Sequence, residues 1–362
     1  MDPVLFERRG RLGVAVLNRP RAVNALNADM VAILLEGLAR WAVDESVATV
    51  LLRGAGDRGL CAGGDIVAIH GDLASGGHAT AAFWRAEYKL DSLVAHYPKP
   101  FVALMDGLVL GGGVGVSAHA RLRVVTERTR TGMPETSIGF VPDVGGLFRL
   151  SRSPGQSGTH AALTGAHLGA GDAVFLGLAY HYVESSSLGD LELALETEPA
   201  ETAVRRYAAA PPSSPLAAAR DWIDAAYAGD DAEAIVGRLR ESGGEASKAA
   251  DTIESKSPTA VKTTLEALRR AAGLATLEEC LDQDFRVGVR MLSTPDFAEG
   301  IRAQVIDKDR TPRWRPATLA DVSRSDVVAR FAPLAAHEQG GELGLSDRVH
   351  AARDHPAKEN AV

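Results

Sequence analysis

Cysteine is scarce in this chain, which has only Cys61 and Cys280 among its 362 residues. So few cysteines exclude a disulfide scaffold and are typical of a reducing compartment. The sequence also lacks an apolar run long enough to span a bilayer, and its first residues lack the basic-then-apolar pattern of a secretory leader. We therefore expect a cytoplasmic protein that has no membrane partner.

Further absences narrow the chemistry. No His-Glu-x-x-His or paired Cys-x-x-Cys motif occurs, so a metal site has no support in the sequence. The net charge of −8 argues against a nucleic-acid partner. With 46% hydrophobic and 24% charged residues, the composition is that of a globular protein, and 362 residues can bury a sizeable core.

The first part of the chain alternates between strand and helix patterns. Residues 4–7 and 12–17 have the alternation of a β-hairpin, and residues 47–52 have the composition of a further strand. Apolar residues recur at helical spacing over 28–43 and 81–97. The order strand, strand, helix recurs as a pattern through residue 126, which predicts an α/β fold.

The later part of the chain is predominantly helical. Helical spacing continues from residue 202 to 291 and is clearest in 259–271 and 277–291. An acidic stretch rich in small residues, 184–201, indicates a boundary. We therefore predict a core of residues 1–200, a helical region of residues 201–335 and a polar, weakly ordered tail of residues 336–362.

Three consecutive glycines, Gly111-Gly112-Gly113, stand between a predicted strand (101–105) and helix-compatible residues (114–120). The first turn of a helix has N–H groups without internal partners, and glycine lets the backbone approach a ligand closely. The glycines therefore suit a site that stabilises a developing negative charge. A flexible turn or tight helix packing is the alternative.

Two acidic residues follow the glycines, each directly after a proline: Glu135 after Pro134 and Asp143 after Pro142. Carboxyl groups near an anion-stabilising turn can move protons or attack a substrate. The structural alternatives are that Asp143 caps a helix and that Glu135 ties a loop to backbone amides. The proximity of both acids to the glycine turn favours catalysis.

The sequence Gly54-Ala55-Gly56-Asp57-Arg58-Gly59 is a literal G-x-G-x-x-G motif after a predicted strand. A dinucleotide site needs these glycines to open a helix directly, but the chain stays rich in glycine up to Gly64. An anion-binding turn at residues 62–65 fits better, with Asp65 capping the next helix. A nicotinamide or flavin cofactor is therefore not expected.

Three potential nucleophiles or bases have simpler explanations. Ser117 and His119 lie in a Gly-Val-Ser-Ala-His segment that lacks the final glycine of a nucleophile elbow, so we expect helix packing. Cys61 neighbours the predicted anion-binding turn, where its thiol could be mildly activated. A packed, unreactive thiol is the favoured interpretation.

Three segments together resemble the crotonase (enoyl-CoA hydratase/isomerase) superfamily: CAGGDI at 61–66, GLVLGGGVGVS at 107–117 and MPETSIGFVPDVGG at 133–146. The pattern is similar to its 3-hydroxyisobutyryl-CoA hydrolase branch, and the resemblance extends over nearly the whole chain. It implies a crotonase-like spiral of strand-strand-helix repeats with a helical C-terminal region. It also implies an oxyanion hole made by the backbone N–H groups of Gly64 and Gly112.

Differences within the superfamily indicate the reaction. Glu135 corresponds to one catalytic glutamate of the hydratases, whereas Gly115 stands where those enzymes have the other. Asp143 stands where the hydratase pattern has glycine. The resemblance implies that Gly115 and Asp143 mark the hydrolase branch, and that Glu87 reaches the acyl part of the substrate.

The implied reaction is hydrolysis of a 3-hydroxyacyl-CoA thioester, first of all 3-hydroxyisobutyryl-CoA in valine breakdown. Coenzyme A would be part of the substrate, along residues 19–27, so no separate cofactor is expected. Ionised Glu135 would activate water or attack the thioester, and Asp143 would protonate the leaving thiolate or position the water. The resemblance also implies a homo-oligomer. An enoyl-CoA hydratase or isomerase and a non-catalytic acyl-CoA-binding subunit are the alternative functions.

Overall fold

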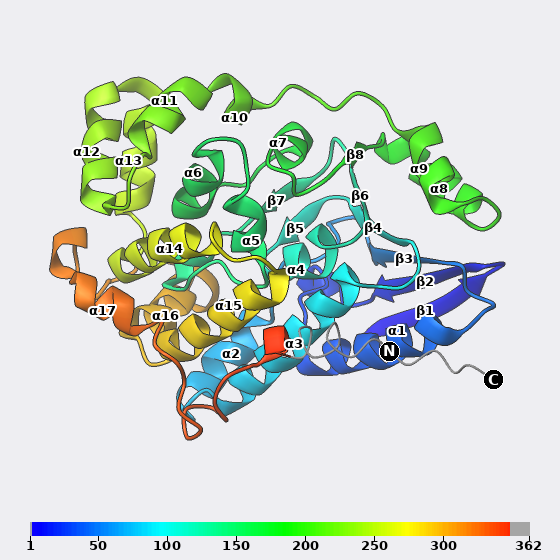
Figure 1. Cartoon of the computed structure of the whole chain (residues 1–362), viewed down its shortest axis with the longest axis horizontal. Coiled ribbons are helices and arrows are strands. Elements are labelled where there is room, and N and C mark those ends of the chain that lie inside the picture. Colours follow the sequence, from blue (N-terminus) through cyan, green and yellow to red (C-terminus); the bar gives the residue numbers. More distant parts are fainter. Residues whose placement is uncertain (1, 348–362) are drawn as a thin grey trace.

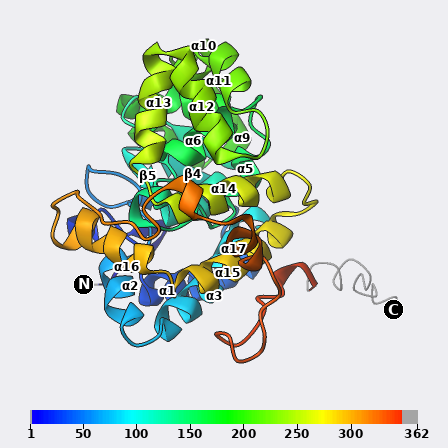
Figure 2. The same ribbon diagram turned by 90° about the vertical axis from the view of Figure 1, so that its left-hand side faces the viewer.

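A computed structural model describes residues 2–347 of the chain. The strands of the larger sheet lie toward one end of the long axis, and helices α11–α17 lie toward the other (Figure 1). Figure 2 shows α10–α13 stacked on one side of α14, with α1–α3 on the other side. Among these described helices, none is long and apolar enough to cross a membrane.

The larger sheet has six strands in the order β1-β2-β3-β4-β6-β8. The β1–β2 pair is antiparallel, and every other neighbouring pair is parallel. Parallel neighbours require crossover connections, which the helices provide. The strands are β1 (Val4–Arg9), β2 (Leu12–Leu17), β3 (Thr49–Gly54), β4 (Phe101–Met105), β6 (Leu122–Val125) and β8 (His181–Tyr182).

A small second sheet supports the glycine turn. It pairs β5 (Leu108–Leu110) in parallel with β7 (Arg130–Gly132). Single bridges also pair Cys61 with Val109 and Gly59 with Gly107. The loop that contains the G-x-G-x-x-G motif is therefore fixed against β5, next to the strand that leads into Gly111.

Most predicted elements of the first part are present. The hairpin is β1–β2, and helix α1 (Ala28–Val43) has the predicted bounds, with Asn27 accepting a hydrogen bond from the Met30 N–H. Asp65 caps α2 (Ile66–Leu73), because its side chain accepts from the Ala68 N–H at 3.3 Å, as predicted. Helix α3 (His78–Ala95) begins slightly before the predicted residue 81.

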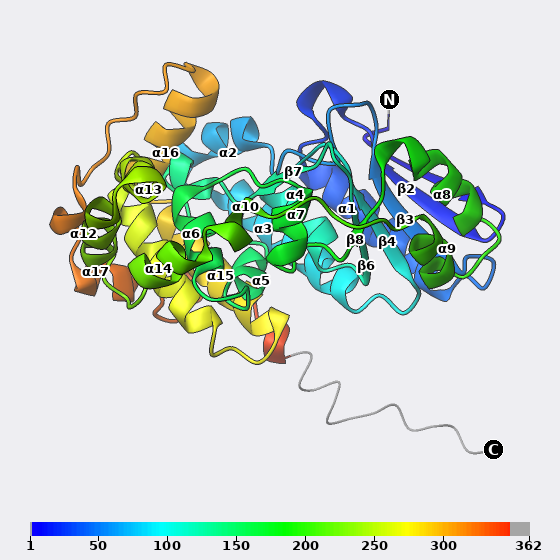
Figure 3. The same cartoon turned by 90° about the horizontal axis from the view of Figure 1, so that it is seen from above.

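The two faces of the larger sheet are covered by different helices. Alternate residues of the central strands, such as Val102 and Val124, pack under α8 (Leu188–Leu195) and α9 (Ala200–Tyr207). Figure 3 shows these two helices beside β2 and β3. The opposite face belongs to the main core. The boundary predicted at residue 200 falls on the first residue of α9, a helix that, like α8, covers the sheet.

Between the glycine turn and α8 the chain forms four short helices: α4 (Gly112–Ala118), α5 (Gly146–Leu150), α6 (Ser157–Thr164) and α7 (Ala170–Phe175). The helical region then contains α10 (Pro215–Ala218), α11 (Arg220–Ala226), α12 (Ala232–Ser242), α13 (Gly244–Glu254), α14 (Pro258–Ala271), α15 (Leu277–Met291), α16 (Pro295–Ile301) and α17 (Arg324–Ala329). Helices α14 and α15 match the predicted segments closely, and each begins at a side-chain cap.

Residues 336–347, the first part of the predicted tail, pack against the body of the protein. We call them the C-terminal arm. Arg85 on α3 donates to the backbone carbonyls of Gly341 (2.7 Å) and Glu342 (2.9 Å). Leu343 and Leu345 are buried. The arm is thus held in place, unlike the weakly ordered segment predicted there, and residues 348–362 of that prediction lie outside the described residues.

Candidate active site

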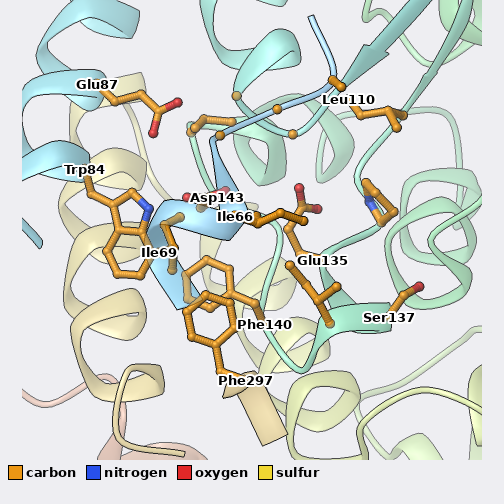
Figure 4. A pocket seen from close by; sticks show the side chains of 18 of the residues that line it. Ile66, Ile69, Trp84, Glu87, Leu110, Glu135, Ser137, Phe140, Asp143 and Phe297 are labelled. Carbon is orange, nitrogen blue, oxygen red and sulfur yellow. The ribbon is translucent and has the colours of Figure 1, made fainter. Parts of the chain in front are cut away.

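All five residues that the sequence analysis assigned to the site line one cavity of about 430 Å³: Gly64, Glu87, Gly112, Glu135 and Asp143. They come from the α2 cap region, α3, α4 and the segment between β7 and α5. The rest of the wall is largely apolar, and the residues that line it include no lysine or arginine. Figure 4 shows Glu87, Glu135 and Asp143 around this cavity.

The glycine turn lets acidic side chains lie directly against the backbone. Gly111 has φ 47° and ψ −119°, a conformation that other residues rarely adopt. A Cβ added to Gly111 would lie 2.7 Å from Oε1 of Glu135, and one added to Gly112 would lie 2.4 Å from Oε1 of Glu87. Any side chain at these positions would displace the acids.

Two backbone amides face this turn. Gly112 is the first residue of α4, so its N–H has no partner within the helix. A Cβ on Gly112 would lie 3.4 Å from the Gly64 nitrogen, so the two segments are adjacent. Within residues 2–347, neither amide donates a hydrogen bond to the protein. Both are therefore available to a ligand oxygen in the cavity.

Glu135 begins a short 3₁₀ turn, Glu135–Ile138, and is 8% exposed. Its Oε2 has no hydrogen-bond partner within residues 2–347, so this oxygen does not tie the loop to backbone amides there. Burial and the negative charge of Asp143 raise the pKa of Glu135 well above its usual range. The turn is held from outside by Lys256, whose Nζ donates to Ser137 Oγ at 2.9 Å.

Asp143 accepts a hydrogen bond from the hydroxyl of Tyr88 at 2.6 Å. Helix α5 starts only at Gly146, with Gly145 as its N-cap residue, so Asp143 is not the helix cap considered as the alternative. Burial raises the pKa of Asp143 to about 6, and the Tyr88 hydrogen bond opposes part of that rise. This carboxyl group changes charge near neutral pH.

Glu87 lies on the face of α3 that points into the cavity and is 2% exposed. Its Oε1 has no hydrogen-bond partner in the described part of the chain. Burial, followed by the charge of Asp143, raises the pKa of Glu87 well above its usual range. Since several charges cannot share a buried pocket without counter-ions, an ionised Asp143 favours the protonated form of Glu87.

Gly115 has no room for a side chain. A Cβ at this position would lie 2.7 Å from Cβ of Val144 and 2.8 Å from Oδ1 of Asp91. Asp91 is fully buried, one helical turn beyond Glu87, and neither of its carboxyl oxygens has a hydrogen-bond partner among the residues that the structure describes. The space that a glutamate at position 115 would need is occupied.

The other potential nucleophiles serve in packing. Ser117 Oγ donates to the Gly113 carbonyl at 2.5 Å, and His119 Nε2 lies 2.8 Å from the Val144 carbonyl. Burial lowers the pKa of His119 to about 3 and raises that of the Cys61 thiol to about 12. These groups are neutral and buried, as the preferred interpretations predicted.

The G-x-G-x-x-G loop lacks the geometry of a dinucleotide-binding turn, because no helix begins at its glycines. A Cβ on Gly59 would lie 2.2 Å from the Leu108 nitrogen, so this glycine allows close packing against β5. The next helix, α2, begins only at Ile66. The loop at 19–27, expected beside coenzyme A, lies next to the α2 cap, because Arg19 and Asp65 form an ion pair at 2.8 Å.

Sequence reasoning missed four side chains at or beside the site: Trp84, Tyr88, Phe140 and Phe297. Trp84 and Tyr88 lie three residues before and one residue after Glu87 on α3, so the helical spacing could have identified them. Phe297 comes from α16, and no local pattern connects it with the glycine turn.

This chain is similar to several known proteins. A sequence model described as enoyl-CoA hydratase/isomerase matches residues 12–331. The protein named 3-hydroxyisobutyryl-CoA hydrolase, mitochondrial, from Danio rerio is 38% identical over 343 residues, which cover 91% of this chain and 90% of that protein. Its counterpart from Homo sapiens is 36% identical over 345 residues, covering 92% and 89%.

Solved structures show the same fold. A protein from Mycobacterium thermoresistibile described as a carnitinyl-CoA dehydratase is 48% identical with a TM-score of 0.90, covering 92% of this chain and 97% of its own. A structure described as an enoyl-CoA hydratase from Rhodobacter sphaeroides is 41% identical with a TM-score of 0.87, covering 94% and 99%. The predicted crotonase-like α/β fold is therefore confirmed. The chain belongs to the enoyl-CoA hydratase/isomerase family.

Proposed function

We propose that this protein hydrolyses a 3-hydroxyacyl-CoA thioester, with 3-hydroxyisobutyryl-CoA as the first candidate, to the free 3-hydroxy acid and coenzyme A. One observation carries the proposal: Glu135 and Asp143, both buried, line the same cavity as two unpartnered backbone amides, those of Gly64 and Gly112. The names of the relatives from Danio rerio and Homo sapiens support the same reaction.

The thioester oxygen would lie between the N–H groups of Gly64 and Gly112. Both donors are fixed by the backbone, so they need no rearrangement when negative charge develops on that oxygen. Loss of one such donor typically lowers a rate by about 10²–10³-fold. The absence of lysine and arginine from the cavity wall leaves these amides as the principal stabilisers of the oxyanion.

The two acids would divide the proton transfers between them. Sequence reasoning gave the ionised role to Glu135, but the contacts support the opposite order, because Asp143 accepts a hydrogen bond from Tyr88 whereas Oε2 of Glu135 has no partner among the described residues. The pKa of Asp143 is about 6, and that of Glu135 is raised well above its usual range. Asp143 would therefore take a proton from the attacking water, and Glu135 would protonate the sulfur as the C–S bond breaks.

A second route forms a covalent intermediate, in which one of the two carboxylates attacks the thioester and water then cleaves the anhydride. A single turnover in ¹⁸O-labelled water distinguishes the routes. Direct attack puts ¹⁸O only into the product acid, whereas anhydride cleavage at the enzyme carbonyl puts ¹⁸O into Glu135 or Asp143. Mass spectrometry of the active-site peptides measures this label.

The proposal is tested by replacing each acid with its amide. Glu135→Gln and Asp143→Asn should each lower the release of free thiol from 3-hydroxyisobutyryl-CoA by roughly 10²–10⁴-fold, the usual contribution of a positioned acid or base. Glu127→Gln is the matched control, because Glu127 bonds to Ser185 and does not line the cavity. Near-normal turnover by both cavity variants would overturn the proposal.

Enoyl-CoA hydration is the second candidate, because the Rhodobacter sphaeroides structure is described as an enoyl-CoA hydratase. The crowded surroundings of Gly115 argue against it, since a second glutamate would collide there with Val144 and Asp91. The two reactions have separate assays: thiol release reports hydrolysis, and loss of absorbance from crotonyl-CoA reports hydration. Faster hydration than hydrolysis would favour the second candidate.

The resemblance to the family also motivates two broader expectations. We expect a homo-oligomer, which sedimentation of the full chain would detect. We also expect a cytoplasmic location, whereas the named relatives from Danio rerio and Homo sapiens are described as mitochondrial. Fractionation of the source cells separates these locations.

A further inference from the structure

Three aromatic rings from distant parts of the chain stack along one wall of the cavity. Trp84 (α3) and Phe140 have ring centroids 5.0 Å apart with an interplanar angle of 25°, and Phe140 and Phe297 (α16) have centroids 4.7 Å apart at the same angle. All three line the cavity. Figure 4 shows them together on one side of Glu135, with Ser137 on the other side.

The aromatic wall forms the closed end of the cavity. Trp84, Phe140 and Phe297 are between 1% and 3% exposed. By contrast, His167 is exposed, and Ala62, Ile66, Ser137 and Gln304 are partly exposed, which puts the opening on the side of the cavity away from α3. Coenzyme A is far too large for about 430 Å³, so it must extend through that opening. The acyl group therefore points toward the aromatic wall.

The three rings of the wall have little space into which they could move away from a ligand. Gly288 of α15 lies behind it, and even a Cβ there would be 3.2 Å from Cζ of Phe140 and 3.4 Å from Cζ3 of Trp84. The rings are therefore packed against a helix backbone with little free space. A longer acyl chain would have to displace buried side chains, which is costly in a close-packed core.

A buried polar group, Glu87, stands beside this apolar wall. Glu87 lies one helical turn after Trp84 on the same face of α3, and its Oε1 lacks a protein partner. A buried carboxylic acid can donate a hydrogen bond to a hydroxyl oxygen and accept one in return. The closed end thus contains a group that can bind the hydroxyl of the substrate. The flat aromatic wall beside it blocks a longer acyl chain.

We propose that Trp84, Phe140 and Phe297 limit the length of the acyl group, so that the cavity accepts short 3-hydroxyacyl chains and excludes longer ones. The specificity would be set by this wall, with Glu87 recognising the hydroxyl. The inference rests on the proposed function, because it assumes an acyl-CoA ligand whose carbonyl meets Gly64 and Gly112.

Binding of S-alkyl-CoA thioethers tests the wall without any turnover. Isothermal titration would compare propyl-, butyl-, hexyl- and octyl-CoA on the wild-type protein and on Phe297→Ala and Phe297→Leu. Since one methylene in an apolar pocket changes discrimination by about 10–200-fold, we expect the wild type to bind hexyl-CoA at least ~10-fold more weakly than propyl-CoA. Both Phe297 variants should reduce the ratio of the hexyl-CoA to the propyl-CoA dissociation constant, and the alanine variant should reduce it more than the leucine variant.

Phe331→Leu is the matched control, because Phe331 is a buried phenylalanine that packs against Arg270 and does not line the cavity. Phe331→Leu should keep the wild-type ratio of the hexyl-CoA to the propyl-CoA dissociation constant. The inference is overturned if wild-type affinity rises steadily from propyl to octyl, or if the Phe297 variants and the control change the ratio equally. A parallel thiol-release assay reports on the proposed function separately, since the binding series needs no hydrolysis.

Discussion

At the scale of single residues, the site concentrates carboxyl groups without positive partners. Glu87, Glu135 and Asp143 line a cavity that has no lysine or arginine in its wall, and Asp91 is buried behind them. Burial raises the pKa of each group, and the charges of neighbouring carboxylates raise the pKa of Glu87, Asp91 and Glu135 further. Such groups suit proton transfer near neutral pH, but they lower the stability of the folded state whenever they ionise.

Replacing Asp143 with asparagine should therefore stabilise the fold at neutral pH. The pKa of Asp143 rises from 3.8 to about 6 on folding, so between these values the folded state holds a proton that the unfolded chain has released. The free energy of unfolding therefore falls by up to about 3 kcal/mol as pH rises through this window. Urea unfolding should show Asp143→Asn more stable than wild type at pH 7 and equal to it at pH 3.5. Equal stability at both values would contradict the buried-carboxyl account.

The same groups predict a bell-shaped pH dependence of kcat/KM. Activity should fall as pH drops below about 6, because Asp143 gains a proton and can no longer act as a base. It should also fall on the alkaline side as Glu135 loses its proton. Stopped-time thiol assays across the pH range measure both limbs, and the residual activity of Asp143→Asn should lack the acidic one. An acidic limb that persists in that variant would assign it to another group.

At the scale of elements, local signals predicted the helices that have side-chain caps. Helices α1, α14 and α15 begin after Asn27, Ser257 and Thr276, and all three match the expected segments closely. The short strands β5 and β7 were not predicted as a pair. Three-residue strands depend on their partner for stability, and that partner is distant in sequence.

The C-terminal arm illustrates the same limit. Its polar composition predicted weak order, but arginines on α3 and α15 bind its carbonyl and carboxylate groups, including Arg286 to Glu342 at 2.6 Å. The sequence shows both partners without showing that they meet. Gly112, Glu135 and Asp143 were predictable because they lie within one stretch of the chain, 107–146, whereas Phe297 reaches the cavity only through the packing of α16.

Breaking the contact between α3 and the arm should weaken the site, because α3 also carries Trp84 and Glu87. Arg85→Met removes hydrogen bonds to backbone carbonyls of the arm and should destabilise the protein by about 1–3 kcal/mol. It should also lower thiol release. Arg40→Met is the control, since Arg40 is largely exposed and its ion pair with Glu36 is 3.9 Å long. An equal loss of stability in both variants, measured by thermal unfolding, would exclude a role for the arm.

At the scale of the whole molecule, the cavity depends on both the sheet-containing part and the helical region. Glu87, Gly112 and Glu135 come from the first part, whereas Phe297 comes from the second. The main apolar core likewise includes residues of both, from Met30 on α1 to Phe285 on α15. A chain that ends at Tyr207 would leave much of that core exposed to water.

We therefore expect the fragment of residues 1–207 to lack both thiol release and a cooperative unfolding transition. The helices of the second part bury apolar faces that have no other cover. Circular dichroism during heating and the thiol assay would measure the two properties. A fragment that unfolds cooperatively and keeps activity would show that the helical region is dispensable.

The lack of space around Gly115 constrains how this enzyme could change its reaction. A glutamate introduced at position 115 alone would meet Val144 and the Asp91 carboxyl, so the single substitution should damage the fold before it could supply a second proton donor. A path from thioester cleavage to alkene hydration would first have to shorten the side chains at positions 91 and 144. The two chemistries are thus separated by several coordinated substitutions, and one point mutation cannot interconvert them.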